Sequence, residues 1–84
     1  MHKFNIKSAE YLTDYKIFLV FDDGVKGVVD LKSFLFDQDC GVFMRLRDEK
    51  QFKDFVVESH TLTWGNDLDL APEFLRGLLV QNSF

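Results

Sequence analysis

The chain has 84 residues, of which 46% are hydrophobic, with ten phenylalanines, one cysteine and a formal net charge of −4. This length corresponds to a single domain over residues 1–84, and the apolar content is sufficient for a small core, which excludes a disordered chain. No apolar stretch approaches the roughly 20 residues that cross a bilayer. One cysteine forms neither an internal disulfide nor a metal cluster. We therefore expect a soluble, cytoplasmic protein that uses no cofactor and does not associate with a membrane.

The basic residues are densest between Arg45 and Lys53, where acidic residues separate them. A protein surface that follows a phosphate backbone needs clustered cations without opposing carboxylates. We therefore expect that the chain does not bind nucleic acid on its own.

The first thirty residues predict a three-stranded antiparallel meander. A first strand is expected over about Lys3–Leu12, from apolar residues that alternate along it. Tyr15–Phe21 is rich in aromatic and β-branched residues, as is typical of a strand. Asp22–Gly24 contains the Asp-Gly pair of a hairpin turn, and Val25–Leu31 then returns as a third strand.

The middle of the chain predicts short helices. Leu31–Phe36 and Val42–Leu46 each have the length of a helical turn, and the polar residues of Asp37–Gly41 separate them. Asp48 is suited to cap the N-terminus of a helix over Glu49–Phe55.

A pair of strands and a helix are expected in the last third of the chain. Val56–Glu58 and Thr61–Trp64 predict two strands joined by a turn, and a loop follows over 65–67. Proline is favoured in the first turn of a helix, so we expect a C-terminal helix over Pro72–Val80. The predicted fold is α+β, a small antiparallel sheet made of the meander and the later strand pair, with two or three short helices against it.

Several short motifs follow one another in a recognisable order along the chain. They are Phe21-Asp22-Asp23-Gly24, Val29-Asp30-Leu31, Gly41-Val42-Phe43, Leu46-Arg47-Asp48, Trp64 and Asp69-Leu70-Ala71-Pro72-Glu73. The ordered set resembles a bacterial family of short proteins, domain of unknown function 2442, from about Ile6 to Leu79. The resemblance implies a small α+β domain and a regulatory or toxin–antitoxin-like setting. It provides no catalytic residue for this chain.

Two groups of residues could carry chemistry. Asp67, Asp69 and Glu73 offer carboxylate oxygens for a hard cation such as Mg²⁺, but carboxylates near a turn and a helix N-terminus also serve as caps. Cys40 with His2 or His60 would be a nucleophile–base pair, but no third orienting group is evident. We expect that neither group forms a catalytic or metal site.

Trp64 is the single tryptophan, and its alternation with Leu62 predicts packing at the edge of the core. Stacking on a ligand is the alternative role for this ring.

The strand over Tyr15–Phe21 is apolar on both faces, because Phe18 and Val20 point away from its other apolar residues. Either the segment that contains Phe36 and Phe43, or the C-terminal segment, covers the second face, or the face is an interface.

The C-terminal helix carries further apolar residues at Phe74 and Leu78, so we predict an interface formed by the second strand, with Phe18 and Val20, or by this helix, with Phe74 and Leu78. The first hypothesis is a non-enzymatic protein-interaction module, active as a homodimer or with a small protein partner. The alternatives are a small metal-dependent hydrolase that uses Asp67, Asp69 and Glu73, and a structural homodimer whose partner supplies the chemistry.

Overall fold

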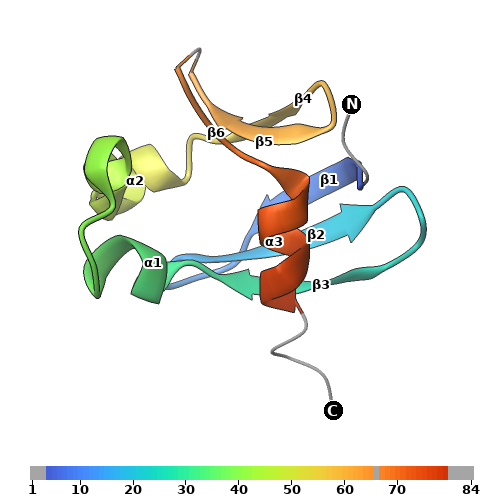
Figure 1. Cartoon of the computed structure of the whole chain (residues 1–84), viewed down its shortest axis with the longest axis horizontal. Coiled ribbons are helices and arrows are strands. Elements are labelled where there is room, and N and C mark those ends of the chain that lie inside the picture. Colours follow the sequence, from blue (N-terminus) through green and yellow to red (C-terminus); the bar gives the residue numbers. More distant parts are fainter. Residues whose placement is uncertain (1–3, 66, 80–84) are drawn as a thin grey trace.

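The computed structural model describes residues 4–65 and 67–79. The predictions for His2, Lys3, Asn66 and Val80 lie outside these residues. The described residues form two three-stranded antiparallel sheets and four short helices, which confirms the α+β class (Figure 1). The strands are β1 (Ile6–Tyr11), β2 (Lys16–Phe21), β3 (Lys26–Asp30), β4 (Val56–Glu58), β5 (Thr61–Trp64) and β6 (Leu68–Leu70). The helices are α1 (Lys32–Phe36), the 3-10 helix η1 (Gly41–Arg47), α2 (Glu49–Phe52) and α3 (Pro72–Leu79).

The first sheet has the order β1-β2-β3, as the meander predicts. Every second residue of β2 is fully buried, and these residues, Ile17, Leu19 and Phe21, define the inner face of the sheet. In the turn after β1, Asp14 and Tyr15 both have positive φ angles, 51° and 66°. Consecutive left-handed residues give the turn the twist of a tight hairpin.

Helix α2 is shorter than the predicted Glu49–Phe55. Its beginning is as expected, because the Asp48 side chain accepts a hydrogen bond of 3.0 Å from the backbone N–H of Lys50. The helix ends at Phe52, whose carbonyl accepts a hydrogen bond from the indole N–H of Trp64. The chain then turns so that the ring of Phe55 packs against Trp64, with a centroid distance of 6.3 Å.

The second sheet has three strands, so the prediction of a strand pair missed β6. Strand β6 pairs with β5 and places Leu68 opposite Trp64 and Leu70 opposite Leu62. These four side chains are buried, whereas Asp69 points to solvent. The two sheets do not share a ladder, but the backbone N–H of Ile6 donates 3.0 Å to the carbonyl of His60 in the β4–β5 turn. The second sheet therefore adjoins the start of β1.

Helix α3 packs on the inner face of the first sheet, in front of β2 and β3 in Figure 1. Leu75 and Leu79 are its buried residues on this side, together with Pro72 at its start. At Gly27 of β3, an added Cβ would lie 3.3 Å from a methyl group of Leu79, so glycine permits this close packing. The position of α3 determines which apolar side chains remain near solvent.

Candidate interaction surfaces

Strand register defines a second apolar surface on the first sheet, on the side that α3 does not cover. Phe18 lies between Glu10 of β1 and Val28 of β3, and Val20 lies between Ser8 and Lys26. Phe18, Val20 and Val28 are half-buried and belong neither to the core nor to the residues packed against it. We call the surface formed by Ser8, Glu10, Lys16, Phe18, Val20, Lys26, Val28 and Asp30 the outer sheet face.

Charged side chains of both signs surround the apolar centre of this face. Glu10 lies on one edge strand and Lys26 on the other, while Lys16 and Asp30 are opposite each other at one end. The Lys16 ammonium is 3.9 Å from Asp30 and 3.7 Å from Asp14. The outer sheet face thus carries two acidic and two basic residues, although the whole chain is acidic.

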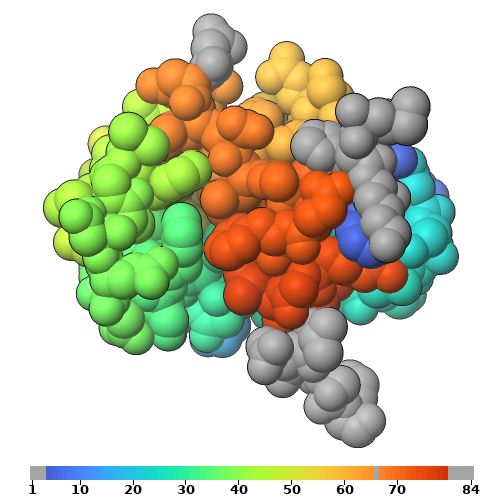
Figure 2. Space-filling view, viewed as in Figure 1, coloured from blue at the N-terminus to red at the C-terminus, as the bar shows by residue number. Residues whose placement is uncertain are grey.

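A separate apolar surface lies where α1, η1 and α3 meet. The ring of Phe34 is 5.6 Å from that of Phe43 and 5.4 Å from that of Phe74, between centroids. Phe74 is 40% exposed, and Val42 and Met44, which flank Phe43 in the chain, are 72% and 48% exposed. We call these five residues the aromatic patch. Figure 2 shows the green segment of α1 and η1 beside the red α3 on one face of the molecule.

The four predicted interface residues are therefore divided between two surfaces. Phe18 and Val20 lie on the outer sheet face, whereas Phe74 and Leu78 belong to α3 on the opposite side of the sheet. Leu78 is half-buried and packs against the core. The sequence did not single out Val28, although the alternation of β3 carries the signal, because Val28 and Val29 point to opposite faces.

Two residues expected to cover the outer sheet face, Phe36 and Phe43, are located elsewhere, and the C-terminal segment is described only up to Leu79, which packs on the inner face. Phe36 packs on Tyr15 with a ring distance of 5.2 Å and lies 5.5 Å from the guanidinium of Arg47. Phe43 packs on Phe34, within the aromatic patch. The contacts of these two residues thus place them at the end of the first sheet and beside α3.

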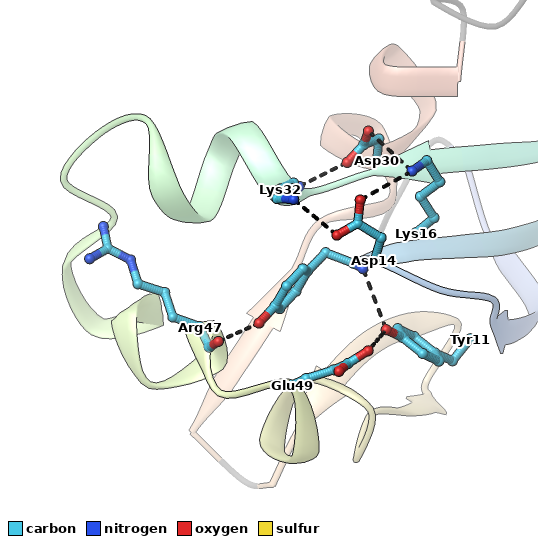
Figure 3. A network of polar contacts seen from close by, with 8 residues as sticks. Tyr11, Asp14, Lys16, Asp30, Lys32, Arg47 and Glu49 are labelled. Carbon is cyan, nitrogen blue, oxygen red and sulfur yellow. Dashed lines mark hydrogen bonds and ion pairs between the residues drawn. The ribbon is translucent and has the colours of Figure 1, made fainter.

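A polar network joins the β1–β2 turn to the helical segment (Figure 3). The hydroxyl of Tyr11 donates to Glu49, and that of Tyr15 donates to the carbonyl of Arg47. Asp14 pairs with Lys32 at 3.0 Å. Partial burial and the Glu49 carboxylate raise the pKa of Tyr11, and the hydrogen bond from Lys32 lowers the pKa of Asp14. These contacts connect two parts of the fold, and each group already has a partner within the chain.

The three carboxylates of the hydrolase alternative are not brought together. Asp67 pairs with Arg45 at 3.2 Å, and Glu73 accepts a hydrogen bond of 3.3 Å from the backbone N–H of Phe4. Asp67 and Asp69 line an open hollow of about 320 Å³ on the second sheet, which Glu73 does not reach. Within residues 4–65 and 67–79, no group of three His, Cys, Asp or Glu is placed to hold a metal ion.

The remaining candidates have structural contacts. Cys40 is buried, with its Sγ 3.5 Å from the carbonyl of Leu35, whereas His60 is exposed in the β4–β5 turn, 4.0 Å from Asp22. Trp64 is 2% exposed, which agrees with the expectation that it packs in or beside the core. Its indole N–H is bound within the chain, so ligand stacking is not favoured.

Comparison with known proteins assigns the chain to a family. The family model described as "Protein of unknown function (DUF2442)" matches residues 6–79. The chain is a member of this family, as its ordered motifs suggest. No curated protein and no solved structure matched the chain. In the described part of the chain, none of the helices has the length and apolar character needed to span a membrane.

Proposed function

We propose that the chain is a non-enzymatic protein-interaction module that binds a small protein partner through the aromatic patch. The observation that carries the proposal is the cluster of the Phe34, Phe43 and Phe74 rings, with Phe74 exposed and with the exposed Val42 and Met44 on either side of Phe43 in the chain. Aromatic residues and methionine are enriched at protein interfaces, and a few well-packed side chains near the centre of an interface supply most of the binding energy.

The composition of the patch supports a protein partner over a small ligand. Its five residues come from three helical elements and are all apolar, and they include no polar group that would orient a small molecule. Methionine adapts its shape to different apolar surfaces. A regulatory or toxin–antitoxin-like pair in a bacterial cytoplasm, as the family resemblance implies, is the setting that we propose for such a partner.

Affinity capture of the tagged chain from its native host, with mass spectrometry of the eluate, tests this proposal. We expect one small protein to co-purify in a fixed stoichiometry and to be lost with the double variant Val42→Ser/Phe74→Ser. Both side chains are exposed, so circular dichroism should show an unchanged fold. Val56→Ser, at a 54% exposed position of β4, is the matched control and should retain the partner. Retention of the partner by the double variant would contradict the proposal.

A further inference from the structure

We infer that the outer sheet face is the site at which two copies of this chain pack face to face as a two-fold symmetric dimer. This surface lies on the opposite side of the first sheet from the aromatic patch, so the inference is independent of the proposed partner site. It follows from the strand register, the burial of Phe18, Val20 and Val28, and the distribution of charge.

The burial pattern first indicates that the face has an apolar centre. Phe18 and Val20 are successive outward-pointing residues of the central strand β2, and Val28 lies beside Phe18 on β3. All three remain half-buried, although the inner residues of the same strands, such as Leu19 and Val29, are 0% exposed. Antiparallel sheets that pack on other sheets carry apolar residues on the packed face, whereas a solvated face is normally polar.

Symmetry then relates the charged residues of one copy to those of the other. A two-fold axis that runs along β2 between the facing sheets places Phe18 and Val20 on their own counterparts. The same axis places β1 of one copy over β3 of the other. Glu10 of each copy then lies over the edge strand that carries Lys26 of the partner copy.

The register sets the spacing of this proposed pair. Glu10 is level with Phe18 and Lys26 is level with Val20, so the two positions are separated by two residues, or about 7 Å along a strand. Facing sheets are also about 10 Å apart, so the four-carbon stem of the lysine and the glutamate side chain must together bridge both distances, which their combined length allows. Neither Glu10 nor Lys26 forms an ion pair within the described part of the chain, so both are available. The same axis places Lys16 on its own counterpart, where Asp14 and Asp30 of each copy offset the like charge.

The size of the face sets the strength of the dimer. Three strands about 4.8 Å apart, each of five or six residues, offer roughly 270 Å² of projected area. This is below the roughly 800 Å² of accessible surface per partner in a typical stable complex, so the dimer should be weak and reversible. A second copy is favoured over an unrelated partner because Glu10 and Lys26 lie on the two edge strands that the two-fold axis exchanges, so each acidic edge meets the basic edge of the other copy.

Sedimentation velocity across micromolar to millimolar concentrations tests the inference through a charge exchange. The wild type should show a concentration-dependent monomer–dimer equilibrium. Glu10→Lys and Lys26→Glu should each raise the dimer dissociation constant about tenfold or more, since both copies then face like charges. An equimolar mixture of the two variants should restore a dissociation constant close to that of the wild type, because the mixed pair regains both opposite-charge contacts.

Glu58→Lys is the control for net charge, since Glu58 is exposed on β4 in the second sheet. It should leave the dimer unchanged. A wild type that is monomeric at all concentrations would overturn the inference, as would a mixture of the two variants that remains as weak as each alone. The pair Val42→Ser/Phe74→Ser should not alter dimerisation, so failure of the partner proposal and failure of the dimer are distinguishable.

Discussion

The indole N–H of Trp64 donates a 2.8 Å hydrogen bond to the backbone carbonyl of Phe52, across the boundary between α2 and the second sheet. The two rings also lie 6.0 Å apart, and both residues are buried. One side chain thus ends a helix and anchors a strand. This contact leads to the first prediction.

Trp64→Phe should lower the free energy of unfolding by about 2–4 kcal/mol, because the variant loses the hydrogen bond to a buried carbonyl and leaves a cavity. Urea denaturation followed by far-UV circular dichroism measures this change. Thr63→Ser, at the neighbouring position of β5, should cost much less. A Trp64→Phe variant as stable as the wild type would show that the contact does not contribute to the fold.

Gly24 and Gly77 should respond in opposite directions to alanine. Gly24 has a φ of +91°, so Gly24→Ala should destabilise the protein by about 1 kcal/mol, and the β-branched Gly24→Val by about 1–3 kcal/mol. Gly77 lies inside α3, and a Cβ added there would meet no other atom within 4 Å, so Gly77→Ala should stabilise the protein by about 0.5–1 kcal/mol. Equilibrium urea titration of the variants checks both signs, and equal stability of wild type and Gly24→Val would mean that the hairpin turn is assigned wrongly.

The two faces of β2 should tolerate substitution differently. Leu19→Ala should cost about 2–5 kcal/mol, since Leu19 is fully buried, whereas Phe18→Ser should leave a folded monomer. The measurement is urea denaturation at low protein concentration, where dimerisation does not contribute. If Phe18→Ser unfolds the chain as readily as Leu19→Ala does, the outer sheet face is ordinary core.

Acidic pH should weaken the ion pair between Asp14 and Lys32. The hydrogen bond from Lys32 lowers the pKa of Asp14 in the folded state below its value in the unfolded chain. The stabilisation is therefore fully present above the unfolded pKa and is lost as the pH falls through the folded pKa. Asp14→Asn should accordingly lose less stability than the wild type between pH 6 and strongly acidic pH, as measured by urea titration at each pH. Identical pH profiles for the two proteins would contradict this role.

Divalent cations should not specifically stabilise the protein, because Asp67, Asp69 and Glu73 do not converge. Thermal melting with and without Mg²⁺, Ca²⁺, Mn²⁺ or Zn²⁺ tests this expectation. A saturable rise in melting temperature at micromolar ion, abolished by Asp69→Ala, would reverse it.

Local patterns in the sequence predicted most of the elements. The alternation of β2, the cap at Asp48 and the position of Pro72 each depend on residues close in the chain, and the structure confirms them. Strand β6 was missed because three residues, Leu68–Leu70, carry too short an alternation to be separated from the approach to a helix. Its identity as a strand depends on pairing with β5.

The candidate surfaces were less accessible to sequence reasoning. The alternation of β2 separated Phe18 from Leu19, but it did not indicate which side α3 covers. The joint surface of Phe34, Phe43 and Phe74 depends on the packing of three elements, which is a property of the tertiary fold. Apolar character alone therefore predicted two possible interfaces, one on the second strand and one on the C-terminal helix, and only the tertiary fold shows what surrounds each of them.

The left-handed conformation of Tyr15 also has a consequence for the order of folding. A tyrosine with a φ of 66° is disfavoured in an isolated hairpin, where glycine or asparagine is normally required. Its ring packs on Phe52 at 5.1 Å, and its hydroxyl binds the carbonyl of Arg47, which lies 32 residues later in the chain. A peptide with only the first three strands lacks these contacts, so the β1–β2 hairpin should close late in folding, after the helical segment has docked.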